Sequence, residues 1–269
     1  MPHMANTQTN DFSKGSVAGN ILRLALPMTV AQLINVLYSV VDRMYIGRLP
    51  DAAGNALTGL GLTFPILSIV TAFANLFGMG GSPLFSIQRG KGDRDRAQVI
   101  LGNTFALLVG TGVALTVVLL VLKRPLLYAF GASDATYPYA DGYLTIYLLG
   151  SIFVMISLGM NQFINAQGFG RTGMLTVLIG AVTNILLDPV FIFVLGMGVQ
   201  GAALATILSQ FLSAVWAVSF LRGKKALIRL EWGSMRLQPK LVWQIVSLGF
   251  SSFVMAITNS IVQVACNST

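Results

Sequence analysis

The run MLTVLIGAVTNILLDPVFIFVL, residues 174–195, decides the fold class, because it is long and apolar yet contains an aspartate and a proline. A helix of this length rises about 30 Å, which is the thickness of the hydrocarbon core of a bilayer. A carboxylate at that depth is costly unless it faces protein or water, so Asp188 indicates an ion or proton pathway. Pro189 removes the amide that would bond to the carbonyl of Ile185, so we expect a helix kink at Pro189.

The composition of the whole chain is typical of a protein that crosses the bilayer several times. Of the 269 residues, 55% are hydrophobic and 10% are charged, whereas about a quarter of the residues in soluble domains are charged. The net charge of +8 does not indicate nucleic-acid binding, because the basic residues lie in short gaps between apolar runs. Cys266 is the single cysteine and His3 the single histidine, which argues against a disulfide, a zinc site and a histidine-based enzyme. We therefore expect no enzymatic activity and no tightly bound cofactor.

Seven apolar runs are long enough to cross a bilayer as helices. They predict an all-α membrane protein with a six-helix transmembrane bundle and a seventh transmembrane helix. The predicted domains are an N-terminal tail (1–20), a six-helix lobe (21–221), a linker (222–240) and the first helix of a second lobe (241–269). The seven runs are residues 21–49, 56–87, 99–122, 137–166, 173–195, 199–221 and 241–266.

The basic residues of the short loops predict the orientation, because cytoplasmic loops are enriched in lysine and arginine. With a cytoplasmic N-terminus, 13 of the 17 basic residues fall on the cytoplasmic side. We therefore expect the N-terminus inside the cell. The four on the outer side are Arg43, Arg48, Lys123 and Arg124, and the cytoplasmic set is Lys14, Arg23, Arg89, Lys91, Arg94, Arg96, Arg171, Arg222, Lys224, Lys225, Arg229, Arg236 and Lys240.

The segment RGKKALIRLEWGSMRLQPK, residues 222–240, is longer and more basic than the other connections. Its apolar residues include Leu227, Leu230 and Trp232. A basic face and an apolar face together favour an amphipathic connector on the cytoplasmic membrane surface. The alternative is a solvated loop.

Five polar side chains are expected to meet inside the membrane. Asp42 and Asp188 each precede the expected outer end of their span by seven residues, which is about 10 Å, and Thr206 and Tyr143 reach about the same level. Asn184 is one turn before Asp188 on the same helix face. Their oxygens are hard donors, which suit sodium or a proton shared between carboxyl groups. The alternatives are that hydroxyls and amides hold Asp188, and that Asp42 lies near the outer headgroups.

Three motifs occur along the chain in a characteristic order. An LALP helix ends in VDRMYIGRL, NAQGFGRTG follows the fourth span, and TNILLDPVFIFVLGMGVQGAALAT occupies residues 183–206. As a set they resemble the multidrug and toxic compound extrusion (MATE) family in its prokaryotic branch, over residues 20–265. The resemblance implies two six-helix lobes that export cationic or amphipathic compounds by alternating access, in exchange for sodium or protons. It also implies a cation site in the first lobe at Asp42, Asn184, Asp188 and Thr206, with Tyr143 as a looser match.

A whole transporter of this family would need five more helices after Cys266. The chain therefore resembles a first lobe plus the first helix of a second, in the cell (inner) membrane. The expected partners are small cationic or amphipathic molecules, membrane lipids and a missing second lobe. Two alternatives remain, an inactive truncated fragment and a lipid-linked oligosaccharide flippase of related architecture. A flippase needs many cationic contacts to pyrophosphate, and Arg43 is the only basic residue well inside a predicted span.

Overall fold

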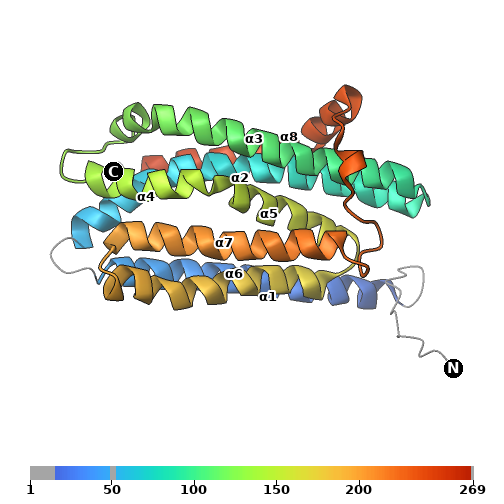
Figure 1. Ribbon diagram of the computed structural model, residues 1–269, viewed down its shortest axis with the longest axis horizontal. Helices are drawn as coiled ribbons and strands as arrows, with labels where there is room; N and C mark the ends of the chain where they lie inside the picture. The colour runs from blue at the N-terminus through green and yellow to red at the C-terminus, as the bar shows by residue number, and fades with distance from the viewer. Residues whose placement is uncertain (1–15, 49–52, 268–269) are drawn as a thin grey trace.

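The computed structural model describes residues 16–48 and 53–267, and within these ranges the chain is helical without a strand (Figure 1). The tail residues 1–15, with Lys14, lie outside the described residues, as do Leu49 and residues 268–269. A π-helical segment, η1 (Val190–Val194), follows α6, and a 3-10 helix, η2 (Trp232–Met235), precedes α8. The α-helices are α1 (Val17–Ile46), α2 (Ala53–Gly90), α3 (Arg94–Ala129), α4 (Tyr137–Leu149), α5 (Ser151–Ala166), α6 (Gly170–Pro189), α7 (Gly198–Arg222) and α8 (Pro239–Asn267).

The lengths and apolar character of the helices confirm the predicted membrane spans. Among the described residues, six helices are long and apolar enough to cross a membrane, and α4 with α5 makes a seventh if the pair counts as one span. Side-chain N-caps mark the first turns of two of these helices. Ser16 Oγ accepts from Gly19 N at 3.1 Å before α1, and Asp93 Oδ1 accepts from Arg96 N at 2.9 Å before α3. The fold is all-α, as the apolar runs predict.

The fourth span consists of two helices, so the expectation of one continuous helix over 137–166 is wrong at Gly150. There α4 and α5 meet at a bend of 55°. A Cβ atom on Gly150 would collide with the side chain of Ile207 in α7, so the glycine lets α7 pack into the bend. The hydroxyl of Thr116 in α3 donates to the carbonyl of Leu148 at 3.0 Å, which gives a partner to a backbone acceptor next to the break.

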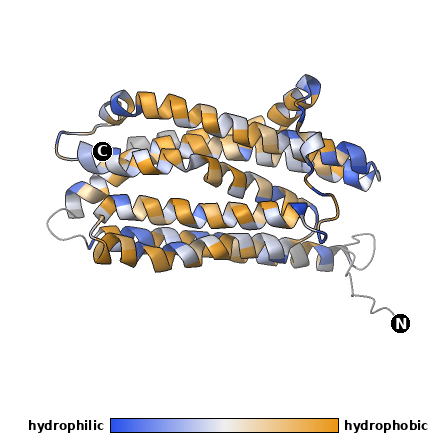
Figure 2. Cartoon of the chain, viewed as in Figure 1, coloured by the Kyte–Doolittle hydropathy of each residue, from blue (hydrophilic) through white to orange (hydrophobic). Residues whose placement is uncertain are grey.

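Most of the helix packing is between elements that are distant in sequence. In one continuous series, α1 packs on α6, α6 on α7, α7 on α5, α5 on α2, and α2 on both α3 and α8 (Figure 1). The interior is apolar, with Phe85 and Phe163 fully buried in edge-to-face contact at 5.4 Å. Apolar side chains also cover the outside of α3, where Val121 is 74% exposed. Figure 2 shows hydrophobic residues along the helices and hydrophilic residues mainly at their ends, which is the pattern expected for a bilayer.

The seventh span, α8, packs closely on α2. A Cβ atom on Gly249 would collide with the carbonyl oxygen of Leu76, and one on Gly80 would collide with that of Ile245. Paired glycines therefore bring the two backbones into direct contact, as small residues do in membrane helices. Phe253 of α8 adds an edge contact to Phe73 of α2 at 5.0 Å.

The connector, residues 223–238, is an irregular segment with one short 3-10 helix, so the structure shows neither an amphipathic α-helix nor a fully solvated loop. Ala226, Ile228 and Leu230 are buried against the bundle. Trp232 is 68% exposed, and the guanidinium of Arg222 lies 5.0 Å from its ring centre.

Two buried amides tie the connector to the helices. From the end of α5, Gln167 Oε1 accepts from the backbone N–H groups of Leu227 and Ile228 at 2.8 and 3.1 Å. From α3, Asn103 Oδ1 accepts from Gln238 N at 2.8 Å, and its Nδ2 donates to Arg236 O at 3.0 Å. These bonds give partners to backbone groups of an irregular segment that has few partners of its own.

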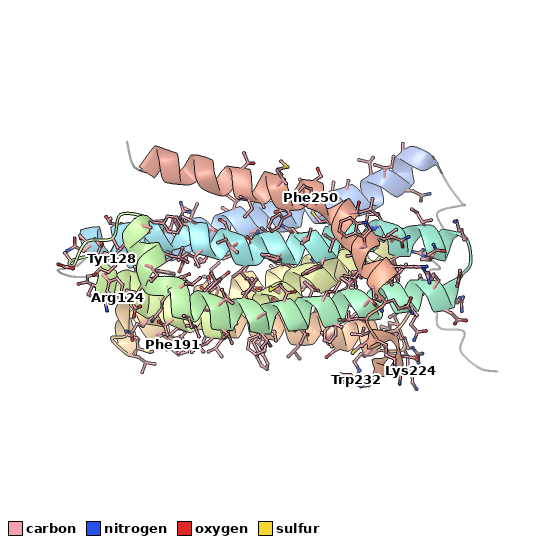
Figure 3. The ribbon with its side chains drawn as sticks, turned by 90° about the horizontal axis from the view of Figure 1, so that it is seen from above. Arg124, Tyr128, Phe191, Lys224, Trp232 and Phe250 are labelled. Carbon is pink, nitrogen blue, oxygen red and sulfur yellow. The ribbon has the colours of Figure 1, made fainter. Side chains whose placement is uncertain are left out.

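The connections between helices define two ends of the bundle. The turns at residues 91–93 and 167–169 and the connector lie at one end, which we call the connector end (Figure 1). The turns after α3 and after η1 lie at the other, which we call the opposite end. In Figure 3, Lys224 and Trp232 mark the connector end, and Arg124 and Tyr128 mark the opposite end. Phe250 labels the middle of α8 in the same view.

Candidate functional site

The first polar residues of the site lie on one face of α1. Asn35, Tyr38 and Asp42 are spaced by three and four residues, which places them on one helix face. All three line a cavity of about 310 Å³ between helices. The described part of α1 ends at Ile46, only four residues after Asp42, so the expected helical stretch to residue 49 is too long. Asp42 therefore lies in the last two turns of its helix.

On α6, Asn184 and Asp188 are one turn apart and nearly inaccessible, with exposed fractions of 1% and 0%. Asn184 Nδ2 donates to Asp188 Oδ1 at 3.2 Å. It also donates to Thr206 Oγ1 of α7 at 3.4 Å. Asn184 therefore contacts both its neighbour on α6 and, through Thr206, the adjacent helix α7.

The two acidic side chains of the site come together from α1 and α6. The carboxyl groups of Asp42 and Asp188 lie close enough to share a hydrogen bond. A carboxylate can only accept, so such a bond requires a proton on one of the two groups. The pair can therefore hold a positive ion or a proton between its oxygens, because two unneutralised carboxylates repel each other at this distance.

Tyr143 and Thr206 complete the group of five side chains that sequence reasoning singled out. Tyr143 on α4 is 4% exposed and lines the same cavity as Thr206. Its ring stacks on that of Tyr147, with 6.2 Å between ring centres. The structure thus places side chains from α1, α4, α6 and α7 around one point. Asp42, Tyr143 and Thr206 line the cavity, and Asn184 and Asp188 lie behind them.

Pro189 stands at a change of helix type. The α-helix of α6 ends at this residue, and the next five residues form the π-helical segment η1. Leu195 N donates to Val190 O at 2.9 Å, a bond over five residues. Proline lacks the N–H group that would continue the α-helical pattern, and π-helical turns occur often at functional sites. The irregular backbone begins directly after Asp188.

Arg43 follows Asp42 in the chain but makes its described contact elsewhere. Its guanidinium lies over the ring of Phe64 in α2, 4.8 Å from the ring centre. Among the described residues, the one salt bridge joins Lys123 and Asp141 near the opposite end, at 2.7 Å. Within the described ranges, no basic side chain forms a salt bridge with the carboxyl pair, although Arg43 lies close enough to attract Asp42 electrostatically.

Unpartnered oxygens mark the site. Among the described residues, five buried side-chain polar atoms lack a hydrogen-bond partner, and all five are oxygens. Three of them belong to the site, namely Asp42 Oδ1, Asn184 Oδ1 and Asp188 Oδ2. A buried acceptor without a donor is costly. Two carboxylates, an amide carbonyl and a hydroxyl fit a hard monovalent cation such as sodium, and they equally fit a shared proton.

Sequence reasoning missed several polar neighbours of the site, of which four are informative. Tyr38 and Asn35 lie one and two turns before Asp42, and Gln210 lies one turn after Thr206. Ser68 of α2 also lines the cavity. The helical spacing from the acid and the threonine could have identified the first three. The sequence around Ser68 does not indicate its role, because Ser68 joins the cavity lining only through the packing of α2 against α1.

Comparisons with known proteins agree with this architecture. The family model described as MatE matches residues 27–190. The multidrug export protein MepA of Staphylococcus saprophyticus subsp. saprophyticus is 26% identical over 266 residues, which cover 98% of this chain and 58% of that protein. The chain therefore spans a little over half the length of the curated relatives it matches.

Solved structures give the same result. An outward-facing multidrug resistance MATE family transporter of the MOP superfamily superposes with a TM-score of 0.86 at 25% identity. It covers 94% of this chain, which corresponds to 56% of that chain. A MOP superfamily transporter from Pyrococcus furiosus has the same TM-score, identity and coverage.

Proposed function

The chain belongs to the MatE family, and on that premise we propose that it forms the ion-binding lobe of an antiporter that couples sodium or proton entry to the export of drugs and toxic compounds. The observation that carries the proposal is the convergence of three unpartnered oxygens, from Asp42, Asn184 and Asp188, beside the Thr206 hydroxyl. Buried acidic residues in membrane helices typically mark ion or proton pathways.

Each side chain has a distinct part in the proposed exchange. Asp42 and Asp188 supply the negative charge, and the Asn184 carbonyl and Thr206 hydroxyl supply neutral oxygens. When no metal cation is bound, one proton between the carboxyl groups relieves their repulsion. A sodium ion would replace that proton and draw all four oxygens inward. Tyr143 lines the same cavity from the α4 side.

The change of helix type at Pro189 supplies the proposed mechanical link. Asp188 is the last residue before Pro189 and η1, so a force on its carboxyl group acts where the backbone lacks regular α-helical bonds. A cation that pulls Asp188 toward Asp42 favours one arrangement of α6 against α1, and its release favours another. We propose that this pair of arrangements underlies alternating access.

The cavity next to the carboxyl pair suits the substrates that the relatives' names suggest. Its lining includes the aromatic rings of Tyr38, Phe64, Tyr143 and Tyr147. Aromatic faces attract cations, and Asp42 adds negative charge to the same lining. At about 310 Å³ the cavity is small for a drug-sized ligand. We therefore propose that a second lobe and membrane lipids complete the substrate path.

The proposed location is the cell (inner) membrane, with the connector end facing the cytoplasm. Eleven of the 17 basic residues lie at or next to this end, in the last turn of α2, the turn at residues 91–93, the first turns of α3, α6 and α8, the end of α7 and the connector. Cytoplasmic loops are enriched in such residues. This orientation places the N-terminus of α1 on the cytoplasmic side.

The test is cation binding by the purified 269-residue chain and dye export after reconstitution. Asp42→Asn and Asp188→Asn should each abolish sodium-dependent or proton-dependent behaviour. Asp95→Asn, which makes the same chemical change at an exposed position of α3, should leave it unchanged. Binding and flux that are insensitive to both substitutions in the site would refute the proposed function.

A further inference from the structure

A second cavity adjoins the carboxyl pair and is not used by the proposed exchange. Its volume is about 120 Å³, and it lies between α1, α5, α6 and α7. It shares Asn35, Tyr38, Leu158 and Gln210 with the cavity that contains Asp42. We call it the amide cavity, because none of the described side chains that line it is charged and its amides are Gln32, Asn35, Asn161, Gln162, Asn165 and Gln210.

The amide cavity lies between the carboxyl pair and the connector end. On α1, Asn35 and Gln32 precede Asp42 by seven and ten residues, so they lie about 10 and 15 Å nearer the connector end. On α5, Asn165 is next to the last residue of the helix, which ends at the turn of residues 167–169. The two cavities therefore form one polar series along the bundle.

The amide cavity contains the remaining unpartnered oxygens. Of the five buried polar atoms without a partner in the described residues, the two outside the carboxyl site are Asn161 Oδ1 and Asn165 Oδ1. These two residues are four apart on α5 and so share a helix face. Every unmet group along the series is an acceptor and none is a donor. Such a one-sided set favours a ligand that is positive or that brings its own donors.

The position of the Asn165 amide depends on a glycine. A Cβ atom on Gly173, in the first turn of α6, would collide with Asn165 Oδ1. Gly173 therefore gives the amide room between α5 and α6. The same NAQGFGRTG stretch contains both residues.

We propose that the amide cavity is a transit site that holds the coupling cation, with part of its water shell, between the carboxyl pair and the connector end. This inference rests on the proposed function, because the cavity carries a cation only if the carboxyl pair exchanges one. Neutral carbonyl oxygens bind a cation weakly enough to release it, as they do in channels. The volume has room for several waters, which suits a hydrated sodium ion or hydronium.

The test measures exchange rates separately from the two faces of the membrane. The chain is reconstituted into sealed vesicles in either orientation. Entry of ²²Na⁺ is measured in one series, and in a parallel series proton entry after a pH step is followed with a pH-sensitive dye. Asn165→Leu removes one carbonyl oxygen, and Gly173→Ala displaces the same amide. Gly110→Ala is the matched control, because a Cβ atom on this α3 glycine meets nothing within 4 Å.

The loss of one oxygen ligand should slow arrival of the cation from the connector end about tenfold in both test variants. The amount bound at equilibrium and the rate from the opposite end should stay unchanged, which a misfolded variant would not show. Unchanged rates from the connector end would refute the transit site alone. A parallel loss of equilibrium binding would also refute it, because Asn165 would then belong to the carboxyl site. If Asp188→Asn takes up both probes as fast as the wild type does, the proposed function itself is refuted.

Discussion

Asn184→Leu should weaken sodium binding without abolishing it. The Asn184 amide donates to Asp188 Oδ1 at 3.2 Å and to Thr206 Oγ1 at 3.4 Å, and its Oδ1 is unpartnered. We expect the bond to Asp188 to persist when a cation binds, so that its loss affects the free and bound states about equally. The remaining effect is the loss of one cation ligand, and a contact to a charged group contributes about 1.5–3 kcal/mol to the binding free energy. This corresponds to a rise in Kd of roughly 10-fold to 150-fold.

The assay is equilibrium binding of ²²Na⁺ to the purified chain over a range of sodium concentrations. Asn103→Leu is the matched control, because Asn103 is an equally buried amide that holds the connector and not the site. It should reduce stability but leave the Kd for sodium within twofold of the wild-type value. A Kd that Asn184→Leu does not change, or that both variants raise equally, would refute the assignment of Asn184 as a ligand.

Two further predictions concern the scaffold around the site. Gly249→Ala should destabilise the packing of α8 on α2 by about 1–3 kcal/mol, because the added methyl group meets the carbonyl of Leu76. Denaturant unfolding in detergent measures this, and an effect no larger than that of Gly61→Ala, whose added methyl meets nothing within 4 Å, would contradict it. Gln167→Leu should cost about 2–4 kcal/mol, because its bonds to buried connector groups are lost. Proteolysis should then cut the connector faster, and unchanged protection would show that Gln167 does not hold it.

The spans were predictable because lipid leaves the backbone few options. A long apolar run in a bilayer must satisfy its N–H and C=O groups internally, so it forms a helix. The break at Gly150 was not predictable in the same way, since a glycine within an apolar run is no stop signal by itself. The bend depends on Ile207, which is distant in sequence and packs against Gly150 from α7.

The arrangement of the connector also depends on long-range contacts. Gln167 and Asn103 bind groups that are about 60 and 135 residues further along the chain. The pattern of basic and apolar residues predicts a surface helix, and it contains no sign of these two amides. The connector buries Ile228 and Leu230 against the bundle, in place of the expected apolar helix face.

The candidate site was more accessible to sequence reasoning than its surroundings. Asn184 and Asp188 are one turn apart, and counting residues from the span ends placed Asp42 at a similar depth. The precise helix ends differ, but both acids lie near the same end of their helices, so the counting errors partly cancel. Asn161 and Asn165 were overlooked, because uncharged amides near the end of a span do not by themselves indicate a site.

The most direct test of the carboxyl pair is difference infrared spectroscopy of the purified chain as sodium is added or the pH is raised. We expect a protonated carboxyl band to disappear when sodium is added and also when the pH is raised. This change should be absent in Asp42→Asn and in Asp188→Asn, and it should be retained in Asp95→Asn. A carboxyl signal that neither sodium nor the two substitutions in the site alter would contradict the claim that these two acids exchange a cation for a proton.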